Sequence, residues 1–329
     1  MKVSLKTGFA IVLVSAIFIA QDANSQDPRY TQEYNAPLRL NPALMGPNPT
    51  MKGIINYRSQ WGNIDKGYTT YRFTFMVPLI NDENGKLDMG LSVFNDKAGA
   101  FSNLNISLAL GYSLNISGDH FLSAALIGGY AQKSIDLEGQ TYDEQYVNGN
   151  YSETNPSNEK IWNEKRSYPD LGFGVLWYLS PDSKLAPFAG FAMQHHNTPN
   201  ESLRDDETSL PVIFNYHGGL KIVGDKFDFT PNLRISTQDG AQDYSIGTYA
   251  DFKINENMKI NAALWYRYRT QNAFAFMLGF EHDYFLIAYS FDLASFEMMN
   301  ASIKGASTHE INLGFMLKKK DQGAKPLVD

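Results

Sequence analysis

The stretch from Asn103 to Leu114 alternates strictly between large apolar residues and small or polar ones. Successive side chains of an extended strand point to opposite faces, so one face carries leucine, isoleucine and tyrosine and the other carries asparagine, serine, alanine and glycine. A strand in a soluble domain is about 5 or 6 residues long, whereas a strand that crosses a bilayer at a tilt needs about 9 to 11. The length of this stretch therefore predicts a membrane-spanning strand.

The same period of two runs from Lys52 almost to the end of the chain, in segments separated by clusters of Asn, Asp, Gly and Ser. Three connections are long, at residues 135–168, 195–210 and 294–307, and all three fall at odd positions when connections are counted from the first strand. Odd connections of an antiparallel sheet emerge on one side. The pattern predicts an all-β fold over residues 51–318, a transmembrane antiparallel β-barrel of about 14 strands with short periplasmic turns and three long outer loops.

Several local features refine this prediction. Each unpaired backbone group costs several kcal/mol in hydrocarbon, so the sheet must close. Pro187 and Pro231 lie within predicted strands, where we expect a bulge or a frayed strand end because proline cannot donate to a ladder. Aromatic residues near strand ends are expected to form girdles at the two membrane interfaces. These residues are Trp61, Tyr68, Tyr112, Tyr130, Tyr178, Tyr268 and Tyr284.

Both ends of the chain lie outside the predicted barrel. Lys2 and Lys6, a short apolar run and a small-residue site at 23–25 predict a signal peptide over residues 1–25. Residues 26–50 are rich in proline, which predicts an irregular, extended segment. Their apolar residues favour a segment that packs against or inside the barrel, as a plug or on the periplasmic side, over a loosely ordered tail. Residues 319–329 form a C-terminal tail.

Composition narrows the function classes. The 329 residues carry a formal net charge of -7, which argues against a nucleic-acid partner because such proteins usually present a basic patch. The absence of cysteine excludes disulfides, thiolate metal sites and cysteine nucleophiles. A soluble periplasmic β-protein remains an alternative, since the mean hydropathy of -0.32 fits either class.

No catalytic motif is present, so we predict no catalytic residue, no cofactor and no metal site. His195 and His196 precede Asp205 and Asp206, but adjacent histidines point apart in an extended chain, which favours a solvated loop over a cation site. The inward-facing charges fit a wet lumen with cross-strand ion pairs, and alternatively a pore or a plug-binding wall. They are Arg58, Arg72, Lys221, Arg234, Asp251, Lys253, Arg267, Asp292 and Glu310.

Three short motifs carry a resemblance. They are the run from Gln26 to Tyr34 with the following Leu-Asn-Pro-Ala to Gly46, the run Asn-Tyr-Arg-Ser-Gln-Trp at 56–61, and Ser-Thr-His-Glu-Ile at 307–311. Together they resemble the PorP/SprF family of outer-membrane proteins of the type IX secretion system in the Bacteroidota. The chain departs at Glu33, where the family more often has an aromatic residue, and at Thr308, which replaces a serine.

The resemblance implies a non-enzymatic outer-membrane barrel that serves secretion or gliding. Its implied partners are a secreted adhesin bearing a type B C-terminal domain, periplasmic type IX components and outer-membrane lipid. The alternative is a diffusion channel or a hydrophobic-solute transporter. The motif residues that we single out as partner candidates are Asn41, Pro42, Ala43, Gly46, Arg58, Gln60, Trp61 and Glu310.

Overall fold

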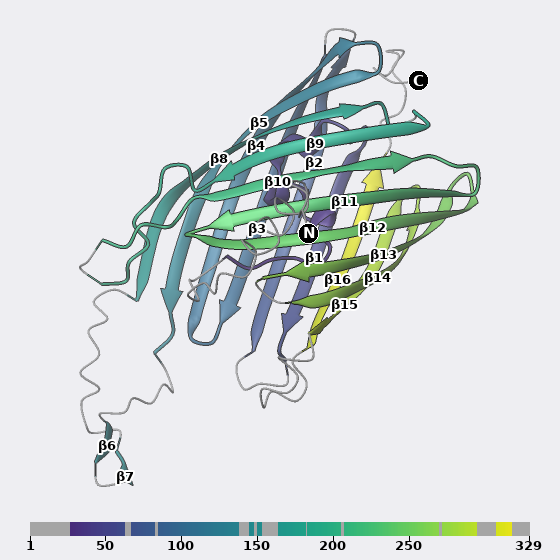
Figure 1. Cartoon of the computed structure of the whole chain (residues 1–329). Helices are drawn as coiled ribbons and strands as arrows, with labels where there is room; N and C mark the ends of the chain where they lie inside the picture. Colours follow the sequence, from purple (N-terminus) through teal and green to yellow (C-terminus); the bar gives the residue numbers. More distant parts are fainter. Residues whose placement is uncertain are drawn as a thin grey trace, which may run out of the picture.

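Fourteen antiparallel strands close into a single barrel in the computed structural model (Figure 1). The structure describes residues 27–317 apart from 63–66, 83–84, 138–144, 148–149, 153–163, 182, 205–206, 270–271 and 295–306. The first and last strands pair with each other, from Met51 opposite Leu317 to Gln60 opposite Thr308, and this seam completes the ring. The predicted barrel is confirmed.

The barrel strands follow one another along the chain, and each pairs with its neighbours in sequence. A separate small hairpin, β6 (Tyr146–Val147) with β7 (Asn150–Tyr151), lies in the connection between β5 and β8. The barrel strands are β1 Met51–Gln60, β2 Tyr68–Asp82, β3 Gly85–Ala98, β4 Phe101–Ser117, β5 His120–Ile135, β8 Lys165–Leu179, β9 Leu185–Gln194, β10 Ile213–Ile222, β11 Phe227–Gln238, β12 Ala241–Asn255, β13 Met258–Tyr268, β14 Ala273–His282, β15 Phe285–Ala294 and β16 Ser307–Leu317.

The connections sort by side as the sequence predicts. At one end of the barrel every connection between consecutive strands is at most five residues long, and we call this end the turn side. The strand ends that the three long connections join, across residues 136–164, 195–212 and 295–306, all lie at the other end, the loop side. In an outer-membrane barrel the turn side faces the periplasm.

Side chains alternate between lipid and lumen as expected. On β4, Leu108 and Leu110 are 58% and 56% exposed, whereas Ala109 and Ser113 between and beyond them are each 1% exposed. The outward apolar face and the buried small face match the prediction from the sequence. Tyr178 is a correction, because it is 6% exposed and points into the lumen with the even-numbered residues of β8, not into a girdle.

The two prolines behave differently from each other. The β8–β9 ladder stops at Tyr178 opposite Phe188, so Pro187 lies where pairing with β8 frays. Pro231 interrupts the β10–β11 ladder between the pairs formed by Gly219 and Ile222, and the register is unchanged, so no bulge forms. The bulges instead lie toward the turn side, for example between Pro78 and Ile80.

Residues 27–50, which we call the plug, lie inside the barrel and are not extended. They form three short helical turns, η2 (Glu33–Asn35), α2 (Pro37–Leu40) and η3 (Pro42–Met45). Pro37 and Pro42 occupy first helical positions, where the missing amide costs nothing and the fixed φ angle suits a helix. Leu38, Ala43 and Met45 are at most 1% exposed and pack with Ile54, Ala109 and Leu176 of the wall. Among the described residues, no helix is long and apolar enough to span a bilayer.

Candidate functional site

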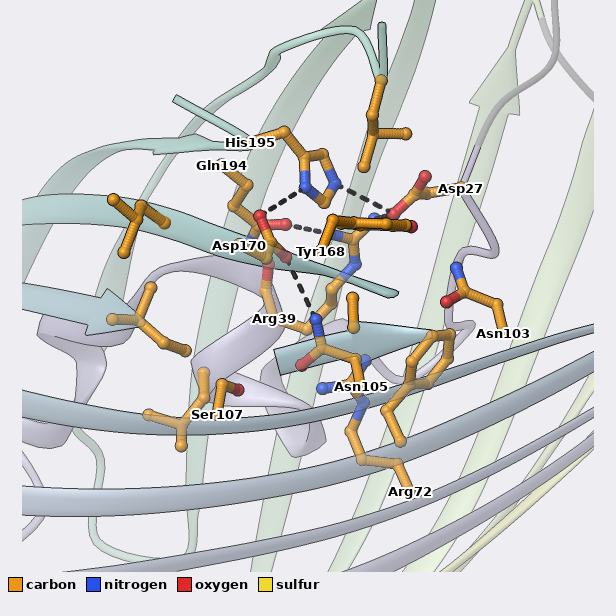
Figure 2. A pocket seen from close by; sticks show the side chains of 17 residues that line it. Asp27, Arg39, Arg72, Asn103, Asn105, Ser107, Tyr168, Asp170, Gln194 and His195 are labelled. Atoms are coloured by element: carbon orange, nitrogen blue, oxygen red, sulfur yellow. Dashed lines mark hydrogen bonds and ion pairs between the residues drawn. The ribbon is translucent and has the colours of Figure 1, made fainter. Parts of the chain in front are cut away.

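The contacts between the plug and the barrel wall form the main polar site of the molecule. At the loop side, His195 lies between two carboxylates (Figure 2): its Nδ1 is 2.8 Å from Asp170 on β8, and its Nε2 is 3.2 Å from Asp27 at the start of the plug. Arg39 of α2 donates to the same Asp27 carboxylate at 2.9 Å. These four side chains form part of the lining of a cavity of about 60 Å³, which holds no more than a few water molecules.

Electrostatics in this cluster favour the charged forms. Burial alone would lower the pKa of His195, but the carboxylates of Asp27 and Asp170 outweigh burial and raise that pKa to about 9. Burial would raise the pKa of the Asp27 carboxyl, but Arg39 and His195 hold it well below its usual range. The imidazolium therefore joins the plug to the wall through two ion pairs at neutral pH.

This geometry corrects the expectation of a solvated loop at His195, which is only 5% exposed. His196 packs edge-on against Phe173, so the two histidines do point apart, although the chain turns here and His195 has a left-handed φ of 57°. Asp205 and Asp206 lie outside the described residues. Within the part that the structure describes, no cluster of histidine and acidic side chains could hold a metal ion.

Asn41, the first residue of the Asn-Pro-Ala motif, fixes the middle of the plug. Its Nδ2 donates to the carbonyl oxygens of Val175 (2.9 Å) and Phe191 (3.3 Å) and lies 3.1 Å from Nε2 of His217. Its Oδ1 caps η3 by accepting from the amide of Ala43 at 2.9 Å. One buried side chain thus joins the plug to β8, β9 and β10.

The turn-side end of the plug is held by Lys86 of β3. Its ammonium donates to the carbonyl oxygens of Met45 and Gly46, both at 2.9 Å, and to that of Asn48 at 2.5 Å. It also pairs with Asp88 at 2.8 Å. Gly46 lies so close to the wall that an added Cβ would be 2.5 Å from Oγ of Ser113, so only glycine fits there.

Glu310 and Arg58 face each other across the β1–β16 seam. The Glu310 carboxylate accepts from the amide of Thr31 at 2.6 Å, and the hydroxyl of Thr31 donates to Asp292 at 2.8 Å. Arg58 is 2% exposed and donates to Gln60 at 2.6 Å. A buried charge is costly unless it is paired, and here the plug backbone supplies part of the pairing.

Further arginines of the wall bind the plug. Arg267 donates to the carbonyl oxygen of Tyr30 at 2.7 Å and pairs with Asp292 at 2.9 Å. Arg72 donates to the hydroxyl of Tyr30 at 2.8 Å, and Arg234 forms an ion pair with Glu33. The inward charges therefore include both cross-strand pairs and a plug-binding wall, the two arrangements that the sequence left open.

The predicted candidate residues fall into three groups. Asn41, Pro42, Ala43 and Gly46 belong to the plug and contact the wall. Glu310 belongs to the wall and binds the plug at Thr31, with Arg58 opposite it and Gln60 bonded to Arg58. Trp61 lies apart, directly after β1 on the loop side, with a left-handed φ of 57° and its ring 5.3 Å from that of Tyr68. The structure does not join these groups into one site.

Sequence reasoning missed Asp27, Arg39, Lys86 and His195 as plug anchors. His195 was singled out for another role, and Asp27 lies 168 positions away from it. Of these four residues, Lys86 alone gave a signal in the sequence, because its position in the alternating pattern of its strand places its side chain in the lumen.

The second long loop forms part of the wall. Where β8 runs beyond its ladder with β9, the amide of His196 donates to the carbonyl oxygen of Leu171 at 2.9 Å, and Nδ2 of Asn197 donates to that of Pro169 at 2.8 Å. Leu210 is 6% exposed and packs against Tyr168 and Ala131. The described part of this loop is therefore an ordered surface on the loop side.

Comparison with known proteins places these observations in context. A family model described as type IX secretion system membrane protein PorP/SprF matches residues 22–315. None of the curated proteins matches the chain. Among solved structures, the toluene transporter TodX of Pseudomonas putida is similar with a TM-score of 0.53 and 11% identity, over 87% of this chain and 94% of that one. The CymD monoaromatic hydrocarbon channel has a TM-score of 0.50 and 11% identity, over 85% and 91%. At such identities the likeness concerns the fold alone.

Proposed function

We propose a function from the premise that this chain belongs to the PorP/SprF family of type IX secretion system membrane proteins. It is a non-enzymatic outer-membrane barrel that retains a secreted surface adhesin by binding the adhesin's type B C-terminal domain. A link to periplasmic components of the same machinery is part of the proposal. The family and the barrel place the chain in the outer membrane as a protein of secretion or channel type.

The fixation of the plug is the observation that carries this proposal. Buried polar contacts hold the plug at the loop side (Asp27), in the middle (Asn41) and at the turn side (Lys86). Moving the plug would break the buried ion pair between Glu33 and Arg234 and the hydrogen bond from the Thr31 amide to Glu310, and breaking a buried pair by removing one partner costs about 3 to 5 kcal/mol. A lumen closed in this way supports a function at the two ends of the barrel rather than passage through it.

The loop side supports adhesin retention. Its second long loop is tied to β8 by backbone and side-chain hydrogen bonds, so it offers a preorganised surface, and preorganisation reduces the entropic cost of binding.

Deletion of the gene tests the proposal. We expect the secreted adhesin that bears a type B C-terminal domain to disappear from the cell surface, as measured by surface labelling with an antibody, and to return when the native gene is restored. An adhesin that remains on the surface of the deletion strain would refute retention.

The alternative function is a channel for hydrophobic solutes. The fold that this chain shares with the toluene transporter TodX is the reason to test it. Planar-bilayer recordings separate the two functions, because a plugged barrel should give no steady conductance. A stable open-pore current from the native protein would favour the channel instead.

A further inference from the structure

The plug fills the lumen unevenly and leaves a cavity at the turn side. Helix η3 contacts β3, β4, β5 and β8, so the turn-side end of the plug lies against one half of the wall. Opposite it remains a cavity of about 380 Å³, which we call the turn-side socket. Its wall consists of the turn-side ends of β8 to β15 and β1, and it includes Pro181 of the β8–β9 turn.

The socket is closed at its inner end. Tyr34 of the plug lies across it, with ring centroids 6.1 Å from Phe188 and 5.8 Å from Tyr249, both in edge-on contact. Leu44 and Pro47 of the plug complete this inner boundary. Because the plug blocks the way to the loop side, an occupant enters and leaves by the periplasmic mouth.

The lining has two different faces. One, the apolar face, consists of residues of β8, β9 and the plug. The other mixes apolar side chains such as Met277 and Leu286 with charged ones on β12, β13 and β14, where Lys259 pairs with Glu281 at 3.1 Å and with Asp251 at 3.7 Å. A pocket of several hundred Å³ with a mostly apolar lining and a few polar groups has the character of a binding site. The apolar face consists of Leu44, Leu176, Tyr178, Leu179, Ala186 and Phe188.

One cation at the mouth is not matched. The lining contains three lysines, Lys52, Lys221 and Lys259, against two acids, Asp251 and Glu281. Lys221 pairs with Asp228 outside the lining at 3.6 Å, but Asp228 also pairs with Lys253 at 2.8 Å, so four lysines share three acids around the mouth. Among the described residues, Lys52 forms no hydrogen bond and no ion pair within 4 Å, and the acid that acts on it electrostatically, Glu281, is already paired with Lys259 at 3.1 Å. An occupant with one negative charge beside an apolar group therefore complements the socket.

We propose that the turn-side socket binds a peptide segment of a periplasmic protein in which large apolar side chains adjoin an acidic residue. This inference rests on the proposed function, whose periplasmic partner it describes by chemistry. The connections around the mouth are two to five residues long, so the backbone of a folded partner can approach the opening closely. Apolar anchors in the pocket supply the affinity, and Lys52 selects the acid.

Calorimetric titration of defined peptides into the purified full barrel in lipid nanodiscs tests the proposal. The probes are three blocked hexapeptides, Gly-Ser-Leu-Phe-Asp-Gly, the same peptide with Asn in place of Asp, and Gly-Ser-Ser-Ser-Asp-Gly, with empty nanodiscs as the blank. We expect the first peptide to bind at least tenfold more tightly than either of the others.

Two variants locate the binding. Lys52→Met keeps the aliphatic stem and removes the charge, so it should abolish the preference for Asp over Asn. Ala186→Leu fills the apolar face and should weaken the first peptide at least tenfold. Ala189→Leu, on the same strand but exposed to lipid, is its matched control and should bind as the native protein does. Heat-modifiable migration in gels verifies that each variant is folded.

Equal binding of the Asp and Asn peptides to the native barrel would overturn the proposal, as would native binding by Ala186→Leu. Binding of dodecanoate that depends on Lys52, without binding of any peptide, would also overturn it and identify a site for small amphiphiles. If Ala186→Leu does not fold, Lys52→Met still decides. The titration measures the socket alone and adhesin display is measured in cells, so failure of one proposal is distinguishable from failure of the other.

Discussion

Replacing Asn41 by alanine tests how the plug is held. The Asn41→Ala variant loses two donated hydrogen bonds, to the carbonyl oxygens of Val175 and Phe191, and the bond accepted from the amide of Ala43. All three partners stay behind in a buried place. Val175 and Phe191 remain paired within the sheet, so each lost hydrogen bond is counted at its net contribution of about 1 kcal/mol. Three lost bonds give about 3 kcal/mol against the docked plug.

Since about 1.4 kcal/mol corresponds to a factor of ten, the undocked plug should become about 100-fold more populated. Hydrogen exchange followed by mass spectrometry reports local opening of this kind. We expect amides of residues 37–50 to exchange about 100-fold faster in Asn41→Ala than in the native protein, while amides of the wall strands keep their rates.

Asn48→Ala is the matched control, because Asn48 lies in the same plug but, within the described part of the chain, its side chain bonds only to the nearby carbonyl oxygen of Thr50 at 2.7 Å. This variant should exchange as the native protein does. The reasoning fails if Asn41→Ala changes exchange of the plug less than threefold, or if the wall strands accelerate equally. The second result would mean that Asn41 stabilises the whole barrel and not the docked plug.

Three further predictions concern other contacts. The pKa of His195 is raised from 6.5 to about 9, so the protonated ring stabilises the docked plug by about 3 kcal/mol; this contribution is complete below pH 6.5 and is lost as pH rises through about 9. Hydrogen exchange of residues 27–36, corrected for intrinsic rates, should therefore accelerate between pH 7 and pH 9.5. In His195→Gln the exchange of these residues should not respond to pH. Lys86→Met leaves Asp88 buried without its cation and should lower the free energy of unfolding by about 3 to 5 kcal/mol, as measured by urea titration in lipid vesicles. Lys97→Met, at an exposed position of the same strand, should change the free energy of unfolding little. Equal effects of the two substitutions would contradict the buried ion pair. Leu108→Arg places a charge on the lipid face and should cost about 2 to 4 kcal/mol in the same assay, with Leu108→Phe near zero; a neutral Leu108→Arg would mean that β4 does not face hydrocarbon.

The barrel could be predicted because each strand has lipid on one side and the lumen on the other. That environment selects large apolar residues at Leu108 and Leu110 and small ones at Ala109, so the pattern is local and readable. Tyr178 was misplaced because tyrosine suits a membrane interface and a lumenal cavity equally well, and only its parity on β8 separated the two.

The plug and its anchors could be predicted only in part. Its apolar residues indicated burial, but its prolines were interpreted as marks of an extended chain, whereas Pro37 and Pro42 begin helical turns. The pairing of His195 with Asp27 depends on closure of the barrel, which brings residues 168 positions apart into contact. No local pattern encodes such a contact, because neither residue alone shows that its partner exists.

The seam between β1 and β16 constrains how the molecule is made. The strand that completes the ring is the last to be synthesised, and the enclosed residues are those that precede the first strand. The machinery that inserts the polypeptide must therefore either enclose the residues before the first strand while the sheet is still open, or insert them through one end after the barrel has closed. Folding of the plug and closure of the barrel are thus steps of one biogenesis pathway, so a mutation in the plug can be observed as a failure to assemble the barrel.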